Sequence, residues 1–162
     1  MNTFDQMPAH ARVWIYQSGR DFTDIEIEEI KKKAAMFLLD WNSHGNLMLA
    51  TIEVMYNRFV VVAADEEAAR ASGCGIDKSV RFVQQLADDY KVDLFDRMLV
   101  CYRGEHSKIK SVKLQVFEQK MELKELDGDT IVFNNLVSTK EEMLAKWEVP
   151  VKKSWHSRML VS

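Results

Sequence analysis

Residues 65–83 read DEEAARASGCGIDKSVRFV, and this stretch joins a run of β-branched residues to an amphipathic helix. Gly73 and Gly75 permit a positive φ angle, or a close approach of the backbone, on either side of Cys74. Asp77 is a good N-cap residue. Apolar residues then recur along one side of a helix, namely Ile76, Val80, Val83, Leu86 and Tyr90. The pattern predicts a shaped loop followed by a helix over residues 77–90.

The predicted Gly-Cys-Gly loop has two interpretations. Free N–H groups at a helix N-terminus favour anions and lower the pKa of a neighbouring thiol, which makes Cys74 a candidate thiolate and Ser72, Gly73 and Gly75 candidate anion contacts. The interpretation that we favour is a tight turn around a buried Cys74, because free cysteine is among the most buried residue types. The stretch has neither the Lys-Ser/Thr ending of a P-loop nor the three-glycine dinucleotide fingerprint, so nothing supports nucleotide binding.

The chain before this stretch predicts a strand, a helix and a hairpin. β-branched and aromatic residues are dense in the first segment, and a capping-box pattern opens the second, where apolar residues recur at spacings of 3 and 4. Asn tolerates positive φ and suits a short turn. These signals predict a strand at 12–17, a helix at 24–41, and strands at 47–55 and 58–64 joined at Tyr56-Asn57.

The chain after this stretch predicts three more strands and two helices. A dense apolar run is interrupted only by Asp96 and Arg97, which suits a strand with an ion pair near its beginning. Alternation of apolar and polar residues favours another strand just after it. The resulting expectation is strands at 94–102, 110–116 and 130–135, helices at 117–126 and 139–147, and a basic, aromatic tail at 150–162.

The order of these elements predicts an α+β fold. Up to residue 102 the order is strand, helix, strand, strand, helix, strand, which matches a ferredoxin-like (βαββαβ) core, and the rest of the chain adds a β/α extension. The 162 residues, 47% of them hydrophobic, suffice for one buried core. We therefore expect a single globular domain over residues 1–162, with a loosely held lead-in at 1–11.

Charge and composition narrow the classes of function. The net charge is −3, and the small basic surplus of residues 103–162, with 11 basic and 9 acidic side chains, does not make the basic face of a nucleic-acid binder. The two cysteines form neither a disulfide framework nor a metal knuckle, and the four histidines lack metal-ligand spacing. No long apolar run predicts a membrane segment. We expect a cytoplasmic protein with no metal, no cofactor and no nucleic-acid partner.

Two polar pairs lie at strand ends. Asp96 and Arg97 must be paired or solvated, because a lone buried charge is costly. Asn134 and Asn135 close a predicted strand before a capped helix, where amides are common in turns but also bind ligands. Each pair therefore has a structural interpretation and a functional one.

His156 is the histidine best placed to contact a ligand, because Trp155 and Arg158 flank it in the tail. An aromatic ring and a cation beside an imidazole suit an anion or ligand contact. The alternative, which we favour, is a tail that docks Trp155 on the core.

Several stretches carry a resemblance to known proteins, namely Val13–Tyr16, Trp41 with His44 and Gly45, Ala71–Asp77 with Ser79 and Val80, Leu94–Met98, Thr130–Val137 with Thr139 and Lys140, and Ser154–His156. Together they resemble a family of short proteins from Bacteroidetes-type bacteria without an assigned activity, some of which carry the label ABC transporter ATPase. The resemblance covers nearly the whole chain and implies a shared fold. The sequence contains no Gly-x-x-x-x-Gly-Lys-Ser/Thr motif, so we do not carry the ATPase label over.

Two hypotheses of function follow. The first is a non-enzymatic cytoplasmic binding or protein-interaction module, because no set of residues forms a recognisable catalytic constellation. Four Trp and nine Met residues also suit an apolar surface for a protein partner. The alternative is an enzyme for a small or anionic ligand that uses the Gly-Cys-Gly loop, with Cys74, Asp77, Asp96 and His156 as its candidate catalytic residues.

Overall fold

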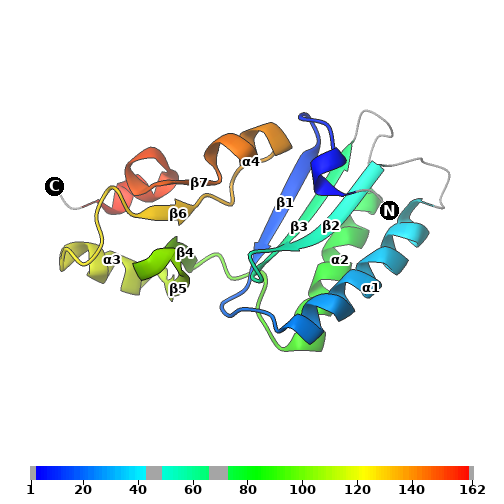
Figure 1. Cartoon of the computed structure of the whole chain (residues 1–162), viewed down its shortest axis with the longest axis horizontal. Helices are drawn as coiled ribbons and strands as arrows, with labels where there is room; N and C mark the ends of the chain where they lie inside the picture. The colour runs from blue at the N-terminus through cyan, green and yellow to red at the C-terminus, as the bar shows by residue number, and fades with distance from the viewer. Residues whose placement is uncertain (1–2, 43–48, 66–72, 161–162) are drawn as a thin grey trace. The chain divides into compact units, whose positions relative to one another are not determined.

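The computed structural model describes residues 3–42, 49–65 and 73–160, and gives only the backbone of residues 42 and 73–75. Helices and antiparallel sheets confirm the α+β class (Figure 1). The chain divides into two compact units. Unit 1 comprises Met1–Phe95 and Ser138–Glu141, and unit 2 comprises Asp96–Val137 and Glu142–Ser162.

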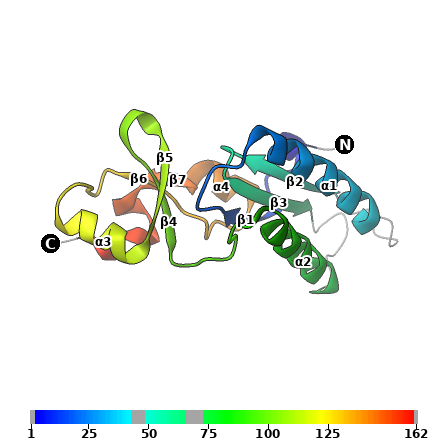
Figure 2. The ribbon, with the colours of Figure 1, turned by 90° about the horizontal axis from the view of Figure 1, so that it is seen from below.

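Unit 1 is an antiparallel sheet with two helices on one face. Its strands β1 (Arg12–Gln17), β2 (Leu49–Met55) and β3 (Phe59–Asp65) lie in the order β1-β3-β2. Helices α1 (Asp24–Asn42) and α2 (Gly73–Tyr90) cover the same face of this sheet (Figure 1 and Figure 2). These are the first five elements of the predicted order, and residues 47–48 of the predicted second strand lie outside the described residues.

The central strand β3 is apolar on both faces, which explains its continuous run of small and β-branched residues. Val60 and Val62 point into the core beneath the helices, whereas Val61 on the other face is also buried. The helices contribute apolar side chains at helical spacing, namely Ile30, Ala34, Leu38 and Trp41 from α1, and Val83, Leu86 and Tyr90 from α2.

The hairpin between β2 and β3 confirms the predicted turn. Tyr56 and Asn57 both have positive φ, at 53° and 59°. The amide of Arg58 donates to the carbonyl of Met55 at 3.1 Å and closes the turn. Two central residues with positive φ are typical of a type I′ turn, whose twist matches that of the strands.

Residues 4–7, within the predicted lead-in, are attached to unit 1 by defined contacts. Phe4, in the 3-10 helix η1 (Phe4–Gln6), is buried, and its amide donates to the Glu53 carboxylate at 2.5 Å. The Lys140 ammonium group is buried and donates to the carbonyls of Asp5 and Met7 at 2.9 and 2.8 Å. Charged donors to backbone carbonyls thus fix this segment.

Unit 2 contains a second antiparallel sheet. Strands β4 (Leu99–Arg103), β5 (Ile109–Lys113), β6 (Ile131–Phe133) and β7 (Glu148–Pro150) lie in the order β5-β4-β6-β7. Its core contains Val100, Tyr102, Phe117, Met121, Val132, Val151 and Met159. The remaining helices are α3 (Leu114–Glu122), α4 (Lys140–Lys146), and the 3-10 helices η2 (Glu105–Ser107), η3 (Val151–Lys153) and η4 (Trp155–Met159).

Strand β4 departs from the predicted topology. A ferredoxin-like core needs this strand in the first sheet, but β4 pairs with β5 and β6 in the second. It also begins at Leu99 rather than at Leu94. The first five predicted elements are therefore found in unit 1, the sixth belongs to the second sheet, and the ferredoxin-like topology is not confirmed.

Helix α3 begins three residues earlier than predicted. Leu114 and Val116, whose alternation with polar residues favoured a strand, lie in the first turn of α3. Phe117 and Met121 of this helix are buried one turn apart. The helical spacing of these larger side chains outweighs the short alternation.

Candidate functional site

The Gly-Cys-Gly stretch forms the first turn of α2 instead of a loop before it. Ser72 lies outside the described residues, and only the backbone of Gly73, Cys74 and Gly75 is described, as helix. Asp77 is therefore an exposed residue inside the helix and not its N-cap, so this part of the prediction is wrong. Whether Cys74 is a reactive thiol stays a prediction.

Asp96 has a structural role at the start of unit 2. Its carboxylate accepts a hydrogen bond from the amide of Met98 at 2.8 Å and pairs with the ammonium group of Lys113. The hydrogen bond from Lys113, followed by that from Met98, lowers the pKa of Asp96. The predicted ion pair with Arg97 is thus replaced by one with Lys113, while Arg97 is exposed.

The two asparagines hold the chain after β6. The side-chain oxygen of Asn134 accepts from the amide of Leu136 at 3.1 Å, and that of Asn135 accepts from the indole N–H of Trp147 at 2.9 Å. These contacts match the turn interpretation of the pair.

His156 is buried, with 1% of its surface exposed. Its Nδ1 lies 2.6 Å from the hydroxyl of Ser154, which also accepts from the amide of His156 at 3.0 Å and caps η4. Trp155 stacks on the imidazole with 3.8 Å between ring centroids, and the guanidinium of Arg158 lies 4.8 Å from the Trp155 ring. The tail is therefore docked, with His156 more deeply buried than Trp155.

The protonation state of His156 follows from its burial. Desolvation, and then the positive charge of Arg158, lowers the pKa of His156 from 6.5 to about 4. The imidazole is neutral at pH 7. The serine and histidine resemble a nucleophile with its base, but both side chains are buried, so the pair stabilises the tail.

The candidate residues of the enzyme hypothesis belong to different units. Cys74 and Asp77 are in unit 1, whereas Asp96, Arg97 and His156 are in unit 2. Their convergence on one pocket stays a prediction.

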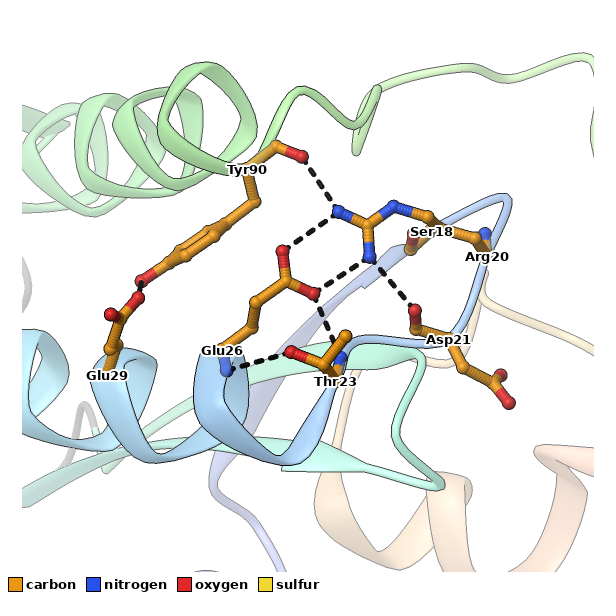
Figure 3. Close-up of polar contacts among 7 residues, drawn as sticks. All are labelled: Ser18, Arg20, Asp21, Thr23, Glu26, Glu29 and Tyr90. Carbon is orange, nitrogen blue, oxygen red and sulfur yellow. Dashed lines mark hydrogen bonds and ion pairs between the residues drawn. The ribbon is translucent and has the colours of Figure 1, made fainter.

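A polar cluster joins the beginning of α1 to the end of α2 (Figure 3). The Arg20 guanidinium donates to both carboxylate oxygens of Glu26 at 2.8 and 2.9 Å, and to the carbonyl of Tyr90 at 2.8 Å. Glu26 and Thr23 form the predicted capping box, through contacts of 2.9 and 3.1 Å. The bond from Arg20, and then that from Thr23, lowers the pKa of Glu26 to about 2. Because its donors and acceptors contact one another, we interpret this cluster as a clamp between the two helices.

A row of exposed apolar side chains on α1 is the feature that the sequence interpretation missed. Ile25, Met36 and Leu39 are 74%, 73% and 75% exposed. With successive helical residues about 100° apart, the three lie within an arc of about 60°. This arc is opposite the side that carries Ile30 and Ala34 into the core. We call the surface of Ile25, Glu29, Lys32, Met36 and Leu39 the α1 stripe.

No family model, curated protein or solved structure matches this chain. Within residues 3–42, 49–65 and 73–160, no group of three or more His, Cys, Asp or Glu side chains is arranged to hold a metal ion. No helix in the same ranges is both long enough and apolar enough to cross a bilayer.

Proposed function

We propose that the protein is a non-enzymatic interaction module that binds a protein partner through the α1 stripe. The observation that carries the proposal is the row of Ile25, Met36 and Leu39, each about three-quarters exposed, on the side of α1 opposite the core. A surface helix normally turns charged and polar residues to this side. Single exposed apolar residues need no explanation, but a row of them indicates a binding surface.

The size of the stripe suits reversible binding. Fully burying an Ile, Met or Leu side chain contributes about 1.5–3 kcal/mol. Association costs about 4–15 kcal/mol in lost freedom of the partners. Three such side chains contribute about 4.5–9 kcal/mol, which is of the same order as this cost, so the net affinity depends on the apolar or polar contacts that a partner adds.

The roles of the other candidate residues support a binding module. Asp96, Asn134, Asn135 and His156 each make contacts that stabilise the chain around them. We place the module in the cytoplasm, because its two cysteines are too few for the disulfide framework of a secreted domain.

The test is capture of partners from cells of origin by the immobilised full chain. A variant with Met36→Ser and Leu39→Ser should lose a partner that the wild-type protein retains. The matched control is Leu123→Ser, which changes a side chain of similar exposure, 71%, in unit 2. Equal capture by the α1 variant and the wild type would reject the proposal, as would measured turnover of a substrate.

A further inference from the structure

We propose that the partner of the α1 stripe is a second copy of this chain, bound with its α1 antiparallel to the first. This inference rests on the proposed function and identifies the partner. It follows from the order of the residues along the stripe, from the charges that the fold leaves available there, and from the symmetry of a two-copy contact.

The stripe has the spacing of a coiled-coil seam. Ile25, Glu29, Lys32, Met36 and Leu39 follow one another at intervals of 4, 3, 4 and 3 residues. This alternation keeps side chains on one line along a helix that packs against another helix. The stretch from Ile25 to Met36 covers about 16 Å at 1.5 Å per residue, which is three turns.

The seam is complementary to the same seam of a second copy that runs in the opposite direction. In an antiparallel pair whose two-fold axis passes between Ile30 and Lys31, Ile25 of one copy lies opposite Met36 of the other. Glu29 then lies opposite Lys32, and each contact occurs twice, as a two-fold symmetric interface requires. Leu39 extends the apolar contact at each end beside Ile25 of the other copy.

The same charges select the direction of the helices. A parallel pair would place Glu29 beside Glu29 and Lys32 beside Lys32, and like charges in contact are destabilising. Polar residues within an apolar seam set register and orientation in this way, at some loss of stability.

Glu29 and Lys32 are the charged residues of the α1 stripe, and no ion pair joins either of them to a residue in the described ranges. Lys31 pairs with Glu28, and Lys33 pairs with Asp89, each at 3.0 Å. Lys32 is exposed and makes no ion pair with any residue in the described ranges. Although Glu29 is one turn away, the two do not pair with each other.

One oxygen of the Glu29 carboxylate is held within the chain, and the other can contact a second copy. Oε1 of Glu29 accepts a hydrogen bond from the hydroxyl of Tyr90 at 3.1 Å. This bond holds the carboxylate on α1 and leaves Oε2 to accept from a lysine of the second copy. Two ion pairs inside a contact flanked by apolar side chains are screened less by salt than exposed pairs.

The experiment compares the oligomeric state of charge variants of the full chain. Sedimentation equilibrium over about 1–200 µM, at low salt, covers the affinities expected of a small interface. The wild-type protein should dimerise. Glu29→Lys and Lys32→Glu should each weaken the dimer by at least about tenfold, because each replaces two attractions by two repulsions. Lys32→Glu removes no described contact within the chain, which guards against a folding defect in the other variant.

Two combinations test the charge pairing, and the first of them also tests the antiparallel direction. The double variant Glu29→Lys, Lys32→Glu should dimerise again, since exchanging both charges restores the complementarity. An equimolar mixture of the two single variants should form a mixed dimer, since each then supplies what the other lacks.

Three results would overturn the inference: a monomeric wild-type protein over the whole range, single variants that dimerise as tightly as the wild type, or a double variant that stays monomeric. Partner capture separates this failure from that of the proposed function. If the wild type is monomeric but the variant with Met36→Ser and Leu39→Ser loses a captured protein, the α1 stripe binds a different partner. If the wild type is monomeric and this variant captures the same proteins as the wild type, both proposals fail.

Discussion

Lowering the pH from 7 to 5 should destabilise unit 2 through His156. The buried imidazole has a pKa of about 4, against 6.5 for an ordinary histidine. The unfolded chain therefore takes up a proton between pH 6.5 and 4 that the folded chain does not. The stabilising contribution of the neutral imidazole is fully present above pH 6.5 and is lost as the pH falls through this window.

The size of the effect follows from the two pKa values. At 1.36 kcal/mol for each pKa unit, the shift corresponds to about 3 kcal/mol over the whole window. Weighting by the protonated fractions of the folded and unfolded chain at pH 5 gives a loss of about 2 kcal/mol relative to pH 7. This is a large part of the stability of a small domain.

The assay is urea unfolding at pH 7 and pH 5 of the wild type and of His156→Gln. The variant should be less stable than the wild type at pH 7, because it disturbs the hydrogen bond to Ser154 and the stacking on Trp155. Between pH 7 and pH 5, however, its free energy of unfolding should fall by about 2 kcal/mol less than that of the wild type. His106→Asn is the matched control, because it removes an exposed histidine whose positive φ of 58° Asn tolerates. Equal losses in the wild type and His156→Gln would refute the reasoning, as would an imidazole that titrates near pH 6.5 by NMR.

Three further predictions concern unit 1. Thr51→Val should raise the free energy of unfolding of unit 1 by about 1 kcal/mol, because Thr51 is 1% exposed and its hydroxyl has no hydrogen-bond partner among the described residues. Urea unfolding beside Thr51→Ser checks this, and a Val variant less stable than the wild type would contradict it. Glu26→Gln should cost about 1 kcal/mol at pH 7. The difference in stability between this variant and the wild type should disappear as the pH falls from 4.5 to about 2. Arg20 lowers the pKa of Glu26, and the carboxylate stabilises the fold only while it is ionised. A difference in stability that persists at pH 2 would exclude the ion pair as its source. Lys140→Met should remove the two hydrogen bonds to the carbonyls of Asp5 and Met7 and lower the free energy of unfolding by about 2 kcal/mol. Amide hydrogen exchange over residues 4–7 should become faster. Unchanged exchange would show that other contacts hold this segment.

Much of unit 1 is predictable because its signals are local. The apolar run of β3, the turn at Tyr56-Asn57 and the capping box of Thr23 and Glu26 each depend on neighbouring residues, and all are observed. These patterns report backbone preferences and burial that need no knowledge of distant contacts.

The partners of β4 could not be predicted in the same way. Its apolar side chains suit either sheet, and the choice depends on pairing with β5 and β6, later in the chain. Its late start has a local cause that the apolar pattern hides, because the carboxylate of Asp96 accepts from the amide of Met98 and turns the chain there.

The candidate sites show the same limit. Trp155 correctly indicated a docked tail, but the depth of His156 depends on the core of unit 2 around it. The 4-3-4-3 spacing of the α1 stripe is visible in the sequence, yet the stronger apolar pattern on the opposite side of α1 already accounted for the helix. Exposure of three large side chains becomes evident only once the core side is known.

The division of unit 1 into two chain segments has a consequence for protein synthesis. The amide of Val13 donates to the carbonyl of Ser138 at 3.0 Å, and that of Lys140 donates to the carbonyl of Ala11 at 2.8 Å. Ser138 leaves the ribosome roughly 2–9 s after Phe95, at about 5–20 residues per second. Until then β1 has an edge without these bonds, and unpaired strand edges promote aggregation. A nascent chain that stalls between these residues would therefore carry the β1-β3-β2 sheet without the backbone bonds that Ser138 and Lys140 later supply beside β1, which makes this an interval in which a chaperone would matter.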